Sequence, residues 1–390
     1  MRSLRRFLAV LAAALIVMPV ATSASAASSS TTQSPVCKRP AHGRVACLAI
    51  RVDTRVGGRV RHASGPVGLV PADLRSAYAL PVTRGSGRTI AIVDAYDDPS
   101  AERDLAVYRS QFKLPACTTA NGCFRKVNQS GGAHVPVTDP GCAQEISLDL
   151  DMASAVCPRC HLLLVEASSA AQANLGAAVD TAARLHAVAI SNSYGGADAS
   201  DSAYGRHYHH PGVAITASSG DSGYGVSYPA SSRWVTAVGG TALRRAHTKR
   251  GWQETAWSGA GSGCAGTNTA PYQQSSTTQC AHRAVADIAA VADPATGVAV
   301  YDSFTFEGTG GWLTFGGTSV AAPIIAAVFA LAGNTSAVDD GSYVWKHHTG
   351  GVNDVTSGSN GTCPTTRWCT ARRGWDGPTG WGTPKGVAAF

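Results

Sequence analysis

The stretch "HLLLVEASSAAQANLGAAVDTAARLHAVAIS", residues 161–191, combines two patterns in one short segment. Its ends, His161–Ala167 and Ala187–Ser191, are short apolar runs of the kind that suits strands buried on both faces. The segment between them, residues 170–185, has the length and composition of a helix. Strand, helix and strand in succession predict parallel strands joined by a crossover helix.

The same alternation extends in both directions along the chain. Further apolar runs occupy Thr89–Asp94, Val213–Ser218 and Trp234–Gly240, and residues 100–112 form another helical segment. We therefore predict an open parallel α/β sheet with helices on both faces. In such sheets functional groups gather in loops beyond the carboxyl ends of the strands, where "SNSYGG" and "SSGDSGYG" fall.

Composition places the chain among ordinary globular proteins. It has 390 residues, of which 44% are hydrophobic and 15% charged, so it can bury a sizeable core. The formal net charge is +7. Basic residues cluster between Lys38 and Arg61 without interleaved aromatic residues, a pattern that favours a solvated, cleavable segment over a nucleic-acid site. We expect no nucleic-acid partner.

Residues 1–26 have the pattern of a secretory signal peptide. Three arginines precede an apolar stretch from Phe7 to Val20, and Ala24-Ser25-Ala26 forms a small-residue cleavage site. A membrane anchor is the alternative, but the apolar stretch is short and contains Pro19. We predict an exported, extracellular protein that has no membrane contact after signal removal.

Ten of the eleven cysteines fall in close pairs, which an oxidising compartment would join as disulfides. The "CPRC" motif at Cys157 is also compatible with half a zinc site or a redox pair, although zinc needs a second pair of ligands. Cys142 is left over and receives no role. The pairs are Cys37 and Cys47, Cys117 and Cys123, Cys157 and Cys160, Cys264 and Cys280, and Cys363 and Cys369.

Two carboxylates lie four residues apart in "QEISLDLDMASAV". On a helix this spacing puts Glu145 and Asp149 on one face, where like charges repel. A solvated helix face is one interpretation of the pair. A functional pair is the other, and it requires further groups from elsewhere in the chain.

"FGGTSVAAP", residues 315–323, supplies a hydroxyl in front of an entirely apolar helix. Pro323 is tolerated only in the first helical turn, so the helix begins at or near Ser319. Ser319 is then either a structural N-cap or a nucleophile beside the backbone N–H groups of the first turn. A third polar group, Asp221, follows a predicted strand in a glycine-rich loop, where turn chemistry is the ordinary role of an aspartate.

These motifs occur together and in a fixed order. "QEISLDLDM", "SNSYGG", "ASSGDSGYGVSYPASSRWVTAVGGT", "FGGTSVAAP" and "NDVTSGSNG…RRGWDGPTGWGTPKG" resemble the sedolisin family of serine-carboxyl peptidases from about Gly68 to the C-terminus. The resemblance implies one catalytic domain over residues 67–390, with a subtilisin-like fold and a seven-stranded parallel sheet. It also implies roles: Ser319 as nucleophile, Glu145 as general base, Asp149 as the acid that orients that base, and Asp221 as the carboxyl group that stabilises the oxyanion.

The resemblance further implies a Ca²⁺ site near the C-terminus. An aspartate with its following carbonyl, two more carbonyls and a second aspartate provide the oxygen ligands that a hard cation prefers. From the residues alone, the two aspartates are compatible with turn positions. The implied ligands are Asp354, Val355, Arg372, Gly374 and Asp376.

The chain departs from the family pattern at its N-terminus. Family members usually carry a long folded prosegment, whereas about forty residues separate Ala26 from the start of the resemblance. Residues 27–66 are therefore predicted to be a short propeptide or a disulfide-clipped N-terminal extension.

We expect a monomeric, secreted endopeptidase that cuts protein or peptide substrates through an acyl-enzyme, most actively in acid, where a carboxyl group at Asp221 holds its proton. Two alternatives stay open. One is a subtilisin-like enzyme with a histidine base, although the usual histidine motif is absent. The other is a non-catalytic secreted protein on the same fold.

Overall fold

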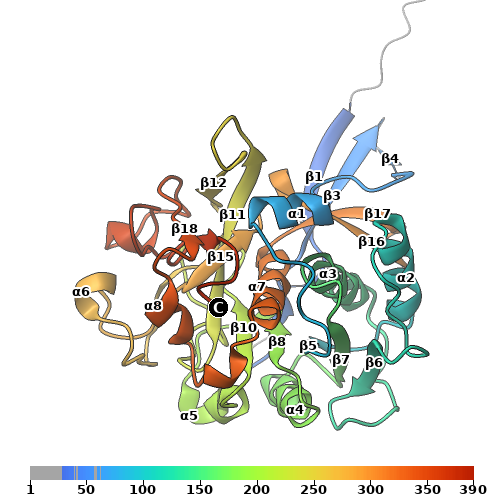
Figure 1. The fold of residues 1–390 in the computed structure, drawn as a ribbon, viewed down its shortest axis with the longest axis horizontal. Helices are drawn as coiled ribbons and strands as arrows, with labels where there is room; N and C mark the ends of the chain where they lie inside the picture. The colour runs from blue at the N-terminus through green and yellow to red at the C-terminus, as the bar shows by residue number, and fades with distance from the viewer. Residues whose placement is uncertain (1–28, 39, 41–42, 57–58, 62) are drawn as a thin grey trace, which may run out of the picture.

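The structure is a computed structural model that describes residues 29–390, apart from residues 39, 41–42, 57–58 and 62. The predicted signal peptide, residues 1–26, lies outside the described residues. Strands, helices and loops of the described part are arranged in layers around one large sheet (Figure 1).

The central sheet confirms the prediction of parallel strands. Within the described residues it has the order β12-β11-β10-β8-β5-β7-β6, with β15 also paired to β11. Seven strands run parallel, and only β12 is antiparallel to its neighbour. Their bounds are β5 Thr89–Ala95, β6 Phe124–Asn128, β7 His161–Ala167, β8 Ala189–Asn192, β10 Ala214–Ser218, β11 Thr236–Arg245, β12 Trp252–Ala256 and β15 Ile288–Val291.

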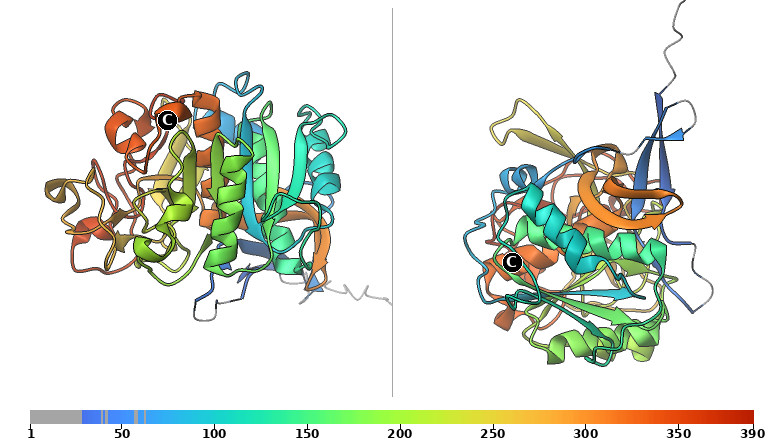
Figure 2. Two further views of the ribbon diagram at one scale, coloured as in Figure 1. Left: turned by 90° about the horizontal axis from the view of Figure 1, so that it is seen from below. Right: turned by 90° about the vertical axis from the view of Figure 1, so that its right-hand side faces the viewer.

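Helices cover both faces of this sheet (Figure 2). On one face α4 packs against β5, β7 and β8, and on the other α7 and α3 pack against the sheet and against each other. The apolar faces of the strands are buried on both sides for this reason. The helices are α1 Pro71–Ala77, α2 Ala101–Gln111, α3 Pro140–Val156, α4 Gln172–Arg184, α5 Asp201–Tyr204, α6 Ser275–Thr278, α7 Thr318–Ala332 and α8 Tyr343–His347.

A second sheet joins the N-terminal segment to the body of the protein. Its order is β1-β3-β17-β16, with β4 paired to β3. The N-terminal strand β3 lies between β1 and β17 (Figure 1). The strands of this sheet are β1 Ser29–Pro35, β3 Ile50–Val56, β4 Arg59–Val60, β16 Val298–Phe306 and β17 Thr309–Gly316. Three short antiparallel pairs lie elsewhere: β2 Ala46–Cys47 with β9 Tyr194–Gly195, β13 Gly263–Cys264 with β14 Ala284–Val285, and β18 Val352–Asn353 with β19 Thr383–Pro384.

Local sequence explains where α3 and α7 begin. The Asp139 carboxylate accepts a hydrogen bond from the Cys142 N–H and caps α3, and Pro140 occupies the first turn, where its missing N–H costs nothing. Gly317 precedes α7 with φ +98°, a conformation that favours glycine. Helix α7 begins at Thr318, next to the predicted start at Ser319, but Pro323 lies inside the helix, beyond the first turn in which it was predicted.

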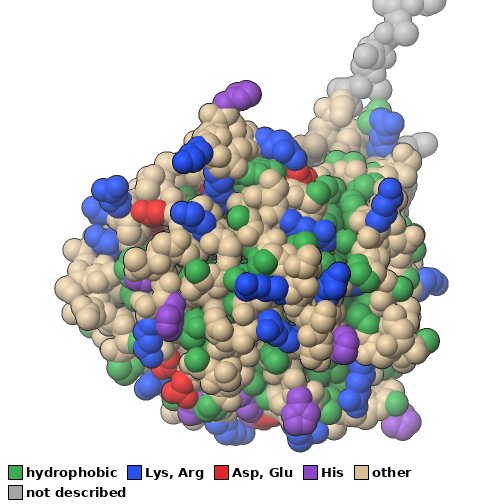
Figure 3. Space-filling view, in the orientation of Figure 1, with side chains coloured by type: hydrophobic (Ala, Val, Ile, Leu, Met, Phe, Trp, Pro, Cys, Tyr) green, Lys and Arg blue, Asp and Glu red, His purple; other side chains and the backbone are tan. Residues whose placement is uncertain are grey.

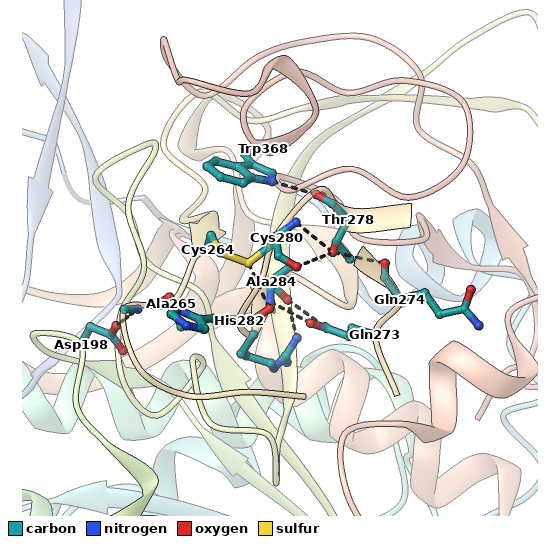
Figure 4. Close-up of a disulfide and its surroundings, with 12 residues drawn as sticks. Asp198, Cys264, Ala265, Gln273, Gln274, Thr278, Cys280, His282, Ala284 and Trp368 are labelled. Carbon is teal, nitrogen blue, oxygen red and sulfur yellow. Dashed lines mark hydrogen bonds between the residues drawn. A yellow bond between two sulfur atoms is a disulfide. The ribbon is translucent and has the colours of Figure 1, made fainter. Parts of the chain in front are cut away.

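All five predicted disulfides are present, and Cys142 is a free, buried thiol. The zinc interpretation of "CPRC" is therefore wrong, since Cys157 is bonded to Cys160 and neither thiol is free to bind a metal. Figure 4 shows the Cys264–Cys280 bridge, beside which the Trp368 indole donates to the Thr278 carbonyl at 2.8 Å. This bridge fastens the α6 loop next to the C-terminal segment that carries the predicted Ca²⁺ ligands.

Lys and Arg side chains are spread over the face shown in Figure 3 rather than gathered into a single stripe. In the part of the chain that the structure describes, no helix combines the length and apolar character needed to cross a membrane.

Candidate active site

Ser319 lies in the first turn of α7 and is fully buried. Gly317, not Ser319, is the N-cap residue, so the N-cap interpretation of Ser319 is wrong. The Ser319 hydroxyl donates to the Ser193 carbonyl at 3.2 Å and accepts from the Leu48 N–H at 3.1 Å. A buried hydroxyl at a helix N-terminus is thus presented to a second segment of the chain.

Glu145 and Asp149 both lie on α3, on the face that packs toward α7. Their side chains are 1% and 0% exposed, so the interpretation of this pair as a solvated helix face is wrong. Both carboxyl oxygens of Glu145 lack a hydrogen-bond partner of good geometry among the described residues. Such unpartnered buried carboxyl groups are costly and mark functional sites more often than structural ones.

Burial raises the pKa of Glu145 well above its ordinary value, and the nearby Asp149 and Asp94 carboxyls raise it further. The Ser319 hydroxyl acts in the opposite direction by hydrogen bonding to the charged form. That contact is long or bent, because neither Glu145 oxygen has a well-formed bond. Catalytic hydrogen bonds are often loose before a substrate complex forms.

Asp149 is fixed by Ser193, whose hydroxyl lies 2.8 Å and 2.7 Å from the two carboxyl oxygens. Burial raises the pKa of Asp149 well above its ordinary value, and Asp94 raises it further. Ser193 therefore links the two halves of the site, since its hydroxyl contacts Asp149 and its carbonyl accepts from Ser319.

Asp94 is also part of this site and was not predicted from the sequence. Asp94 is 3% exposed, its Oδ2 has no partner among the described residues, and burial raises its pKa to about 7. It lies near the end of β5, one of the strands predicted from the sequence. The rule that functional groups lie beyond the carboxyl ends of parallel strands was sufficient to include it.

Asp221 reaches the start of α7 from the loop after β10. Its Oδ1 accepts hydrogen bonds from the Thr318 N–H at 2.7 Å and from the Thr318 hydroxyl at 2.8 Å. Its Oδ2 is buried without a partner among the described residues, and burial raises the pKa of Asp221 to about 7. Because Oδ1 accepts two hydrogen bonds, Oδ2 is the oxygen available to carry the proton when Asp221 is neutral. Thr318 was also missed from the sequence.

The structure thus brings Ser319, Glu145, Asp149 and Asp221 together, joined by Asp94. Beside Glu145 and Asp94 lies a cavity of about 410 Å³, bounded on its other side by the N-terminal segment around Cys37 and Cys47. Neither hydrogen bond of the Ser319 hydroxyl is to a histidine. Among the described residues, the titratable group that contacts the Ser319 hydroxyl is the Glu145 carboxyl group.

The predicted Ca²⁺ ligands lie together in the C-terminal loops. The Asp376 carboxylate accepts from the Arg372 N–H at 2.9 Å, and Asp354 accepts from the Gly374 N–H at 3.0 Å. Burial raises the pKa of Asp376 to about 7, and nearby Asp354 adds to this rise. The carbonyls of Val355, Arg372 and Gly374 accept no hydrogen bond from another described residue.

This donor set suits a hard cation, because it combines two adjacent carboxyl groups with free carbonyl oxygens and no sulfur or imidazole. The described residues include no cluster of three or more His, Cys, Asp or Glu side chains suited to a metal. A cation at this position would therefore depend on backbone oxygens for much of its coordination.

Known protein families and solved structures resemble this chain in sequence and in fold. A model of the subtilase family matches residues 138–378, which include α3, the Asp221 loop and α7. The chain belongs to the subtilase family. Kumamolisin from Bacillus sp. (strain MN-32) is 30% identical over 366 residues, and the match covers 83% of this chain. The chain spans 63% of the length of kumamolisin.

Solved structures agree with this family assignment. Pseudomonas sedolisin, a serine-carboxyl proteinase solved with two molecules of pseudo-iodotyrostatin, superposes with a TM-score of 0.66 at 25% identity, covering 83% of this chain and 96% of that one. Fervidolysin from Fervidobacterium pennivorans, a keratinolytic enzyme related to subtilisin, shares the fold with a TM-score of 0.50 at 16% identity, covering 87% and 52%. The predicted subtilisin-like fold and the resemblance to the sedolisin family are both confirmed.

Proposed function

We propose that this subtilase-family chain is a secreted serine-carboxyl endopeptidase that hydrolyses peptide bonds through an acyl-enzyme on Ser319. One observation carries the proposal: a fully buried serine hydroxyl lies beside the buried Glu145 carboxyl group, neither of whose oxygens has a well-formed hydrogen bond among the described residues. A serine becomes a nucleophile only when a neighbouring base removes its proton. Glu145 is the titratable group that contacts this hydroxyl.

In the first step Ser319 Oγ attacks the substrate carbonyl carbon while Glu145 accepts the hydroxyl proton. Glu145 then gives that proton to the leaving amine, and water hydrolyses the acyl-enzyme by the reverse roles. Asp149 and Asp94 titrate together with Glu145 because three buried carboxyl groups cannot all ionise. Because the three groups share protons, the first of them to lose its proton does so at a lower pH than the others, and that group acts as the base.

The developing oxyanion receives two hydrogen bonds in this proposal. One comes from the Ser319 N–H at the start of α7 and the other from protonated Asp221 Oδ2. Asp221 donates only while it holds its proton, and its pKa is about 7. Turnover is therefore supported below pH 7 and declines as the pH rises through this value, which is the physical basis for an acidic enzyme.

Ca²⁺ binding is part of the proposal, with Asp354 and Asp376 as carboxylate ligands and the carbonyls of Val355, Arg372 and Gly374 completing the set. When bound, the ion would neutralise the two carboxylates and stabilise the C-terminal loops. Export is proposed from the signal-like pattern of residues 1–26 and from five disulfides, which form in oxidising compartments. Protein or peptide substrates suit the resemblance to Pseudomonas sedolisin.

The test is hydrolysis of a denatured protein between pH 3 and pH 8 by the wild type, Ser319→Ala and Glu145→Ala, with melting temperatures to establish folding. We expect activity in acid for the wild type and its loss in both variants. Activity that survives Glu145→Ala would favour the subtilisin-like alternative with a different base. A folded wild type with no activity at any pH would favour a non-catalytic protein.

A further inference from the structure

An open hollow lies at the end of the central sheet opposite the candidate active site. It is lined in part by His161, the first residue of β7, whose N–H donates to the Arg88 carbonyl at 2.9 Å. The Arg88 guanidinium in turn donates to the carbonyls of Ala330 and Leu331 at the C-terminal end of α7, at 2.6 Å and 3.1 Å. Because a helix rises by about 1.5 Å per residue, this end of α7 lies about 18 Å from Ser319. The hollow is therefore separate from the site already described.

The side chains that line the hollow carry positive charge. Its volume is about 390 Å³, and Arg109, Arg159 and His161 contribute to its wall. Among the described residues, its lining includes no acidic side chain. Such a distribution attracts an anion, since no carboxylate in the wall competes for the cationic groups.

Two disulfides hold this wall in shape. The Cys157–Cys160 bridge closes the short loop that carries Arg159, and the Cys117–Cys123 bridge closes a neighbouring loop. The two loops are in contact, because the Cys123 sulfur lies 3.6 Å from the Cys160 carbonyl oxygen. A wall that is fixed before a ligand arrives loses little conformational entropy on binding. The "CPRC" motif, which has no part in the proposed peptidase function, thus keeps Arg159 in place.

Arg109 supplies a buried cation beneath this wall. Its side chain is 1% exposed, and its guanidinium donates to the Pro115 carbonyl at 2.6 Å, the Ser154 hydroxyl at 2.7 Å and the Pro158 carbonyl at 2.6 Å. These bonds tie the two disulfide loops to α3, which is a structural role. They use three of the five N–H donors of the guanidinium, and all three acceptors are neutral oxygens.

The charge of Arg109 is therefore not matched by a hydrogen-bonded carboxylate. Burial lowers the pKa of Arg109 to about 10, nearby Asp151 opposes this shift and nearby Arg75 adds to it. The guanidinium is still charged throughout the acidic and neutral range. A buried cation without a counter-ion is costly, so an anion in the hollow would stabilise it.

Arg159 and His161 provide the accessible donors. Both residues are exposed, and their side chains have no hydrogen-bond or ion-pair partner among the described residues. An arginine guanidinium matches two oxygens of a phosphate, sulfate or carboxylate group at once. The two residues flank Cys160, so the disulfide places both at the same wall of the hollow.

We propose that this hollow binds an oxyanion, with Arg159 and His161 as its direct partners and Arg109 as the buried charge beneath them. The inference is independent of the proposed peptidase function. The anion is either free in solution or a phosphate-type group carried by a larger molecule, since the hollow is open and larger than a single such group.

The experiment is calorimetric titration of the full chain with inorganic phosphate and with glucose 6-phosphate at pH 5, in piperazine buffer with chloride keeping the ionic strength constant. We expect saturable binding of at least one of them, weakened about tenfold or more in Arg159→Ala and several-fold in His161→Ala, since each change removes a charged hydrogen bond. Arg125→Ala, which removes an exposed arginine on the neighbouring strand β6, should leave binding unchanged. Tighter binding of glucose 6-phosphate supports a group on a larger molecule, and tighter binding of inorganic phosphate supports a free anion.

Melting temperatures without phosphate and hydrolysis of an added denatured protein should match the wild type in all three variants. Absence of saturable binding of either compound to the wild type would overturn the inference. Equal weakening in Arg125→Ala and Arg159→Ala would also overturn it, because only a diffuse attraction to a basic protein would then be present. If Arg159→Ala fails to fold, the comparison of His161→Ala with Arg125→Ala still decides the point.

Discussion

Two pairs of acidic residues in this molecule are built in opposite ways. Glu145 and Asp149 are carried one turn apart by α3, and both Glu145 oxygens lack partners of good geometry among the described residues. Asp354 and Asp376 are carried by C-terminal loops, and backbone N–H groups donate to each of them. Both pairs bring two carboxyl groups together, but only the second is arranged as a set of oxygen ligands with nearby free carbonyls.

The difference shows how surroundings assign function to the same chemical group. A rigid helix face buried against α7 keeps carboxyls desolvated, coupled and close to a hydroxyl, which suits proton transfer. Loops that turn their backbone around the carboxyls suit a cation that stabilises the fold. We therefore expect changes to the α3 pair to affect catalysis and changes to the C-terminal pair to affect stability.

The largest effect should come from combining Ser319→Ala with Glu145→Ala. Each single change is expected to lower kcat by at least about 10⁴-fold, and the double variant should be no worse than either alone, because residues that act as one unit lose activity only once. Steady-state hydrolysis of a peptide at pH 4 measures this. If the two losses in kcat multiply in the double variant, Glu145 does not act together with Ser319 as one catalytic unit.

Asp221 should show a smaller effect that depends on the replacement. Asp221→Ala removes an oxyanion donor and should lower kcat by about 10²–10³-fold. Asp221→Asn keeps an acceptor for the Thr318 N–H and a permanent N–H₂ donor at the position of Oδ2. The Asp221→Asn variant should retain much of the activity, and its kcat should no longer decline as the pH rises through 7. If kcat of Asp221→Asn still falls above pH 7 as in the wild type, another titratable group causes the fall.

Removal of Ca²⁺ should change stability more than chemistry. At a free concentration 100-fold above Kd, the ion would stabilise the folded state by about 2.7 kcal/mol, so a chelator should lower the melting temperature by several degrees. Asp354→Asn should weaken this response. Because the loops lie outside the α3 pair, the variant's initial rate at low temperature should match the wild type. A melting temperature indifferent to the chelator would contradict the Ca²⁺ proposal.

Buried carboxyls also predict how stability depends on pH. The pKa values of Asp94, Asp98 and Asp221 are raised to about 7, and that of Asp302 to about 8, chiefly by burial. The folded state therefore binds protons that the unfolded state has lost above pH 4. Stability from these groups is complete below their unfolded pKa values and is lost as the pH rises through 7 and 8.

Thermal unfolding at constant ionic strength should accordingly give a higher melting temperature at pH 4.5 than at pH 8. Asp98→Asn, which removes one of these titrations, should reduce the difference. A melting temperature that rises from pH 4.5 to pH 8 would show that these carboxyls are ionised in the folded protein without penalty.

The sequence predicted most of the central sheet because its strands are continuous apolar runs. The strands at residues 89–94 and 161–167 and the helix after Gly317 lie where the pattern indicated. The four residues named for catalysis are gathered in one site. Ser193 and Thr318 were missed because their roles depend on contacts between distant elements, whereas Asp94 was missed although it lies near the end of a predicted strand. The pairing of β2 with β9 could not be predicted from the sequence either, because neither two-residue segment has a pattern that identifies its partner.

The most direct test of the central claim compares two buried aspartates on the same helix. Asp149 faces Ser193 and the nucleophile, whereas Asp151, equally buried, accepts from the Tyr301 N–H on β16. The comparison measures kcat/KM for a peptide at pH 4 in Asp149→Asn and Asp151→Asn, together with their melting temperatures. We expect a loss of about 10²-fold or more for Asp149→Asn and activity near wild type for Asp151→Asn. Equal activity in two folded variants would contradict this expectation.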